Sequence, residues 1–114
     1  MDIQSERRQQ TIVISLAGSF DALTADQVRS TILKQFDEAQ QVVLDLSRVH
    51  FMSSSGVRVL LEMLKRGRET GGDLCLAGAQ PGVQHTLEIS GMVRILKAYA
   101  SLEEAVGSFG RPEA

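Results

Sequence analysis

An apolar segment that leads into a helix through three consecutive serines constrains this chain more than any other feature. Residues 41–46 are almost entirely apolar, which is typical of a strand covered on both faces. Ser53, Ser54, Ser55 and Gly56 follow, and a helical repeat of apolar residues begins at once. The hydroxyls therefore lie at the start of a helix, where backbone N–H groups and the helix dipole favour negative charge. A serine there is well placed to carry a phosphate, although the same serines could also be plain helix caps.

Strand-like and helix-like segments alternate along the chain. Hydrophobic patterning and turn residues predict strands at 3–8, 11–17, 41–46 and 74–77, and a weaker one within 92–98. The same signals predict helices at 25–39, 54–69, 81–90 and 102–109. After an N-terminal antiparallel pair, this alternation predicts an α/β fold with a mostly parallel sheet of four to five strands and about four helices. We expect one domain over residues 1–110 and a flexible tail over 111–114.

Residue spacing predicts the caps of two of these helices and the buried face of a third. Thr24 with Gln27, and Ser101 with Glu104, have the spacing of a capping box. In the helix after the serines, the apolar repeat predicts a buried stripe. Its expected members are Val57, Leu60, Leu61 and Leu64.

The charge balance gives no sign of a nucleic-acid or membrane surface. Lys and Arg number 12 against 14 Asp and Glu, for a net charge of −2, so no basic footprint exists. No apolar run approaches the roughly 20 residues of a membrane span. Residues 1–8 lack the apolar segment of a signal peptide. The lone Cys75 suits a reducing compartment, and we expect a cytoplasmic protein.

Enzymatic chemistry finds little support in the sequence. The glycine motifs that hold phosphates and the G-x-S-x-G elbow are absent. The two histidines, His50 and His85, and Cys75 are too scattered for a metal site, although His50 could touch the serines. Asp45 lacks the neighbouring carboxylates that a magnesium-dependent phosphoacceptor needs. We therefore expect no catalytic residue, no metal and no cofactor, and a Cys75 that serves as a small core residue.

Several short motifs, in order and in spacing, resemble those of STAS domains, the fold of bacterial anti-sigma factor antagonists. Residues 18–25 resemble the family segment G-E-L-D-x-x-T-A, and residues 43–52 resemble its central strand and loop approach. Residues 54–57 match the end of its D-S-S-G-L signature apart from the last position. Residues 71–74 and 89–92 match two later signposts. The resemblance covers nearly the full length of the chain.

The resemblance implies a switch controlled by phosphorylation. In the antagonist branch, the unmodified protein binds an anti-sigma factor that is itself a serine kinase of the GHKL type, and this frees the sigma factor. The kinase phosphorylates the serine after the signature aspartate, and a metal-dependent serine phosphatase reverses the reaction. By position, the phosphoacceptor is Ser54. The partner-binding residues implied are Asp21, Ser53, Ser54, Ser55, Gly56 and Arg58.

One departure from the family pattern keeps alternatives open. Ser53 stands where the family has its aspartate, which leaves the acceptor to be chosen among Ser53, Ser54 and Ser55. A second function is a scaffold or accessory STAS subunit, in a stress-sensing assembly or a lipid-transport complex, with the serines as a constitutive protein contact. A third is a sensor that uses the same loop as an anion site.

Overall fold

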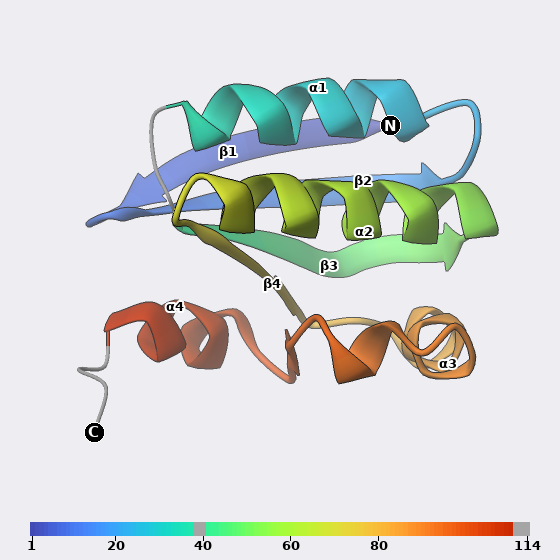
Figure 1. The fold of residues 1–114 in the computed structure, drawn as a ribbon. Helices are drawn as coiled ribbons and strands as arrows, with labels where there is room; N and C mark the ends of the chain where they lie inside the picture. The colour runs from blue at the N-terminus through green and yellow to red at the C-terminus, as the bar shows by residue number, and fades with distance from the viewer. Residues whose placement is uncertain (38–40, 111–114) are drawn as a thin grey trace.

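The structure, a computed structural model, describes residues 1–37 and 41–110. In this part of the chain a five-stranded sheet carries helices on both faces (Figure 1). The strands lie in chain order: β1 (Asp2–Arg8), β2 (Thr11–Phe20), β3 (Gln41–Met52), β4 (Asp73–Ala77) and β5 (Ala98–Tyr99). β1 is antiparallel to β2, and the other neighbours are parallel. The predicted α/β fold with one antiparallel strand is confirmed.

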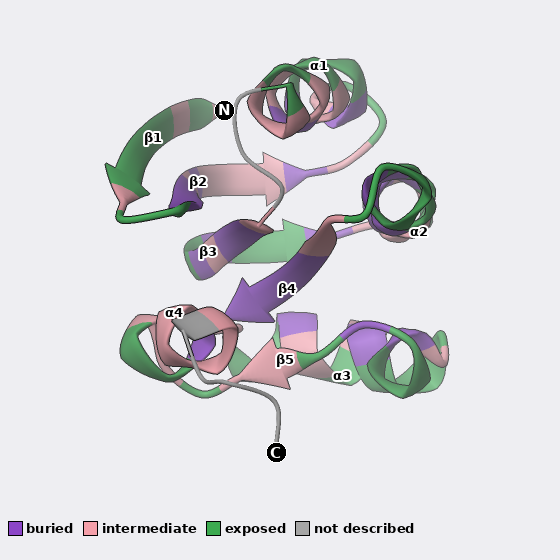
Figure 2. Ribbon diagram, turned by 60° about the vertical axis from the view of Figure 1, so that its left-hand side comes forward, coloured by how far each residue is buried: buried purple, intermediate pink, exposed green. Residues whose placement is uncertain are grey.

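Three helices cover one face of the sheet and one covers the other. The helices are α1 (Ala25–Phe36), α2 (Ser54–Glu69), α3 (Pro81–Ile89) and α4 (Leu102–Gly110), with a short 3-10 turn, η1 (Met92–Arg94). Figure 2 shows α1, α2 and α3 on one side of the strands and α4 on the opposite side. The larger core lies beneath the first three helices and includes Phe20, Leu44 and Leu60. A smaller cluster around Val43 and Ala105 lies beneath α4. β3 is thus covered on both faces, as its apolar run predicted.

The expected strand within residues 92–98 is largely wrong. Residues 92–94 form η1, and β5 begins only at Ala98. Met92 and Leu96 are both buried in the larger core, and the backbone N–H of Leu96 donates to the carbonyl of Met92 at 2.8 Å. Two apolar residues four positions apart reach one core through a helical turn, whereas an extended strand would place them about 13 Å apart.

The buried stripe of α2 differs in part from the predicted one. Leu60 and Leu64 are buried as expected, but Val57 and Leu61 are only partly covered. The remaining buried positions are Gly56, Val59, Met63 and Gly67. At Gly56 and Gly67 the helix backbone lies close to its neighbours. A Cβ atom added at Gly67 would lie 2.6 Å from the ring of Phe36 on α1.

The two expected capping boxes have different outcomes. The Ser101 hydroxyl accepts a hydrogen bond from the N–H of Glu104 at 3.2 Å and caps α4. The expected box at Thr24 is wrong, because the Thr24 side chain makes no capping bond to α1. α1 ends at Phe36, earlier than predicted. Residues 38–40 and the expected tail over 111–114 lie outside the described residues.

Candidate functional site

The three serines lie at the carboxyl end of β3, next to the end of β2. Phe20 and Met52 are register partners at the ends of these two strands. The N–H of Ser53 then donates to the carbonyl of Phe20 at 2.9 Å, which ties the start of α2 to β2. Ser53 has an extended backbone and is the N-cap of α2, and its hydroxyl accepts from the N–H of Gly56 at 3.4 Å. We call residues 53–56 the serine loop.

The three serines are not equally accessible. Ser54, the first residue of α2, is exposed, whereas Ser53 and Ser55 are partly buried. No acidic residue lies in the first turn of α2, so the positive end of its dipole is uncompensated there. Arg58 is exposed four residues later and shares a helix face with Ser54. Ser54 is therefore the most exposed of the three serines, at the N-terminus of α2 and on the helix face that also carries Arg58.

Gly56 is required by the close approach of α2 to β2. An added Cβ atom would lie 2.8 Å from the carbonyl oxygen of Phe20 and 3.0 Å from Cγ of Met52. These distances are too short for a side chain, so only glycine allows the helix to begin here. Gly56 is buried, and it shapes the site by setting the position of the serine loop.

Asp21 lies in a neighbouring turn of residues 21–24, at the same end of the sheet. Its carboxylate accepts a hydrogen bond from the N–H of Leu23 at 3.0 Å, and its own N–H donates to the Thr24 hydroxyl at 3.0 Å. The Thr24 hydroxyl in turn donates to the carbonyl of Ser19 at 2.8 Å. The structure thus brings Asp21 to the same edge as the serine loop and fixes its turn with side-chain bonds. Sequence analysis did not single out Leu23, which this turn leaves 95% exposed.

The remaining polar residues near the site make local contacts. The imidazole Nε2 of His50 and the hydroxyl of Ser19 lie 3.0 Å apart on adjacent strands. The Asp45 carboxylate accepts from the N–H of Ser47 at 3.0 Å. Among the residues described, no group of three His, Cys, Asp or Glu side chains could hold a metal ion. The serine loop itself offers one exposed hydroxyl, that of Ser54.

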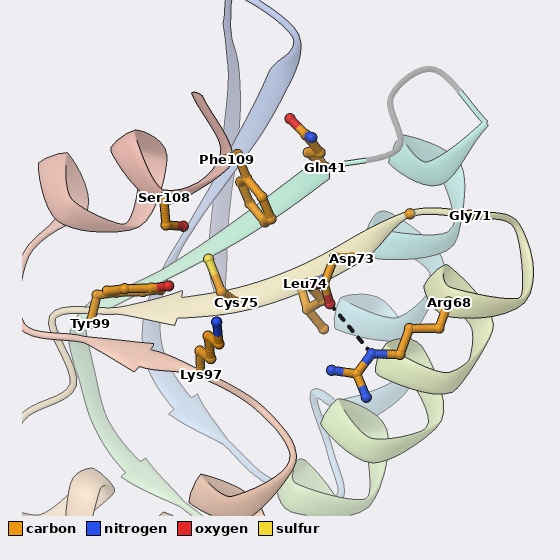
Figure 3. Close-up of a pocket in the computed structure, with 11 residues that line it drawn as sticks. Gln41, Arg68, Gly71, Asp73, Leu74, Cys75, Lys97, Tyr99, Ser108 and Phe109 are labelled. Atoms are coloured by element: carbon orange, nitrogen blue, oxygen red, sulfur yellow. Dashed lines mark hydrogen bonds and ion pairs between the residues drawn. The ribbon is translucent and has the colours of Figure 1, made fainter. Parts of the chain in front are cut away.

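A cavity of about 520 Å³ lies at the opposite end of the strands (Figure 3). It adjoins Gln41 and Asp73, the first residues of β3 and β4. Figure 3 shows the Cys75 thiol directed toward Ser108 and Phe109, the Lys97 amine and the Tyr99 hydroxyl nearby, and the Arg68–Asp73 ion pair to one side. Burial raises the pKa of the Cys75 thiol to about 12, and nearby Asp73 adds to this effect. A protonated, buried thiol agrees with the expected core role of Cys75.

The fold and the serine loop define a small α/β domain with an exposed hydroxyl on a preformed surface. The model of the STAS domain family matches residues 2–105. The chain belongs to the STAS domain family. No helix in the described part of the chain has the length and apolar character needed to cross a membrane.

Its relatives bear the names of regulatory proteins. The anti-sigma F factor antagonist of Paenibacillus polymyxa is 32% identical over 105 residues, which cover 87% of this chain and 86% of that protein. BtrV of Bordetella bronchiseptica, named as a candidate anti-sigma factor antagonist, is 32% identical over 96% of this chain and 95% of its own. The unphosphorylated form of the anti-sigma factor antagonist SpoIIAA superposes with a TM-score of 0.81 at 26% identity, covering 98% of this chain and 100% of that one. A phosphorylated SpoIIAA from Bacillus gives a TM-score of 0.72 at 25% identity, over 95% and 99% of the two chains.

Proposed function

We propose that this protein is an anti-sigma factor antagonist that binds its anti-sigma factor through the serine loop while Ser54 is unmodified. Phosphorylation of Ser54 by that anti-sigma factor, a serine kinase of the GHKL type, releases the partner, and a serine phosphatase restores binding. The observation that carries the proposal is the position of Ser54. It is the exposed first residue of α2, in a chain whose relatives are named for this role. The protein itself contributes no catalytic residue.

The electrostatics of the loop suit a phosphate that blocks binding without unfolding the domain. A phosphoserine adds about −1.5 to −2 charges and three acceptor oxygens. At the start of α2 it would lie at the positive end of the helix dipole, which stabilises a negative charge by about 0.3–1 kcal/mol. Arg58, on the same helix face, is a second source of attraction. An interface that covers Ser54 would instead have to bury an unpaired dianion, which is costly.

The first test is to map the phosphate. The protein is incubated with ATP and each purified GHKL-type serine kinase encoded in the same genome, and the products are mapped by peptide mass spectrometry. We expect phosphate on Ser54, its loss in Ser54→Ala, and its retention in the matched control Ser55→Ala. Phosphate found only on Ser53 or Ser55 would contradict the assignment of the acceptor.

A constitutive protein contact is the second candidate function. The observation that favours it is Ser53, which stands in place of the family aspartate and acts as the N-cap of α2. A loop without that carboxylate could serve as a permanent docking surface of a scaffold or accessory subunit. Stable binding of a partner with no phosphate on residues 53–55, under any kinase tested, would select this candidate over the first.

A further inference from the structure

Leu23 is the most exposed large apolar side chain in the described part of the chain, at 95% of its full surface. It directly precedes Thr24, the N-cap residue of α1. A leucine at that position commonly packs against the fourth residue of the helix as a hydrophobic staple. That residue is Val28, which is completely buried in the core and leaves Leu23 in solvent. Packing within this chain therefore does not account for Leu23.

The backbone that carries Leu23 is held in place by hydrogen bonds on both sides. The N–H of Leu23 donates to the Asp21 carboxylate at 3.0 Å. The Thr24 hydroxyl donates to the Ser19 carbonyl at 2.8 Å and accepts from the N–H of Asp21 at 3.0 Å. Thr24 thus uses its hydroxyl to close this turn, which explains why it does not cap α1. An exposed apolar side chain on an ordered turn loses little backbone entropy when it binds.

We propose that Leu23 is an apolar anchor of the partner interface and that Thr24 is the positioning residue that holds it. The occupant is an apolar pocket on the anti-sigma factor, next to the surface that receives Ser54; this inference rests on the proposed function. The two contacts are continuous, because the turn of residues 21–24 follows Phe20 and the Phe20 carbonyl accepts the N–H of Ser53. One rigid edge therefore presents a leucine and the switch hydroxyl together.

A second copy of this chain is a poorer fit for Leu23. A stable symmetric dimer buries roughly 800 Å² on each partner around an apolar centre. Around Leu23, Ala22 and Asp26 are exposed and Asp21 offers a carboxylate, so the turn presents a single large apolar side chain among small and charged ones. One aliphatic group in such surroundings suits insertion into a pocket on a different protein, where a few residues dominate affinity.

The test measures affinity by calorimetry between the unphosphorylated protein and the kinase that phosphorylates it. Leu23→Ala should weaken binding by about ten- to a hundredfold, because the aliphatic group no longer leaves water on binding. The matched control is Ile95→Ala. Ile95 is 43% exposed, and its carbonyl accepts from Arg68 near the far end of α2, fourteen residues from Ser54. This control should bind like the parent protein.

The role of Thr24 needs a readout beyond loss of affinity. Thr24→Val should weaken binding, and Thr24→Ser, which restores the hydroxyl, should recover it. In a Leu23→Ala background, Thr24→Val should cause little further loss, because the residue acts through Leu23. Leu23→Ala should also raise KM for phosphorylation of Ser54 with little change in kcat, as expected for a contact made equally in the ground and transition states.

The outcomes separate this inference from the proposed function. Parent-like affinity of Leu23→Ala, with Ser54 still phosphorylated, would overturn the anchor and leave the function intact. Failure of every kinase to bind or phosphorylate the parent protein would overturn both. Concentration-dependent dimerisation that Leu23→Ala abolishes, in sedimentation experiments without any kinase, would show that a second copy is the occupant and would also overturn the inference.

Discussion

Individual residues at the carboxyl ends of β2 and β3 have separate roles, and the role of Gly56 is structural. We expect Gly56→Ala to destabilise the domain by about 1–3 kcal/mol, because its Cβ would lie 2.8 Å from the Phe20 carbonyl oxygen. The matched control is Gly82→Ala on α3, where a Cβ would meet nothing within 4 Å and a helix-favouring residue should be neutral or stabilising. Urea unfolding of both variants measures the difference. Equal stabilities would show that α2 can move away from β2 at no cost.

The buried thiol of Cys75 predicts a pH dependence of stability. Its pKa rises from 9.0 to about 12 through burial first and Asp73 second, so the unfolded chain releases the proton at lower pH than the folded one. The contribution of the protonated Cys75 thiol to the free energy of unfolding should therefore be fully present below pH 9 and be lost as the pH rises from 9 toward 12. Denaturant midpoints between pH 7 and 10.5, compared with those of Cys75→Ala, isolate this contribution. A parallel decline in the variant would assign the effect to other groups.

At the scale of elements, the N-terminus of α2 depends on Ser53 as its cap. Ser53→Ala should destabilise the protein by about 1 kcal/mol, because the Gly56 N–H loses its acceptor. Ser53→Asp keeps a capping oxygen and should fold as well as the parent. Thermal unfolding of the two variants tests the cap. An undiminished melting temperature in Ser53→Ala would show that solvent replaces the hydroxyl.

Ser53→Asp also tests what the family aspartate does for phosphorylation. Charge repulsion alone should slow the transfer of phosphate to the adjacent Ser54. We nevertheless expect a faster initial rate, because the carboxylate would orient the acceptor or contact the kinase. Initial rates of parent and variant at equal kinase and ATP decide the matter. A slower or unchanged rate would indicate a protein that stays mostly unmodified and binds its partner steadily.

The sequence predicts well those elements whose hydrophobic pattern alone shows how they are buried. The apolar run of β3 and the periodic helix α2 were readable, because burial on both faces and a 3.6-residue repeat leave strong patterns. The serine loop followed from its place after β3. By contrast, the turn at residues 92–96 forms because Met92 and Leu96 pack into the same core cluster, a contact that the local sequence pattern does not show. The Thr24 hydroxyl could either cap α1 or donate to the Ser19 carbonyl, and in the folded structure it donates to Ser19.

The exposure of Leu23 could not be predicted for a related reason. Its position before a helix is that of a staple residue, and only the orientation of α1 shows that the side chain stays in solvent. In the same way, the family motif indicates a glycine at position 56, but only the close approach to the Phe20 carbonyl explains why a side chain does not fit there. Contacts between segments distant in sequence are therefore what the sequence did not reveal at this site.

At the scale of the whole molecule, the proposed switch acts on a surface of a domain that keeps its fold. Ser54 belongs to neither of the two core clusters. A charge at Ser54 should therefore change the interface and leave the core as it is. This separates the proposed mechanism from one in which modification melts part of the domain.

Ser54→Asp tests that separation. An acidic residue in the first turn of α2 interacts favourably with the helix dipole, so the melting temperature should stay the same or rise by up to about 5 °C. Affinity for the anti-sigma factor should fall at least tenfold, because the interface would have to cover a carboxylate. The control Ser5→Asp adds the same charge at an exposed position of β1 and should affect neither quantity. A loss of affinity that accompanies a clearly lower melting temperature would mean that the switch works through the fold, whereas unchanged affinity would place Ser54 outside the interface.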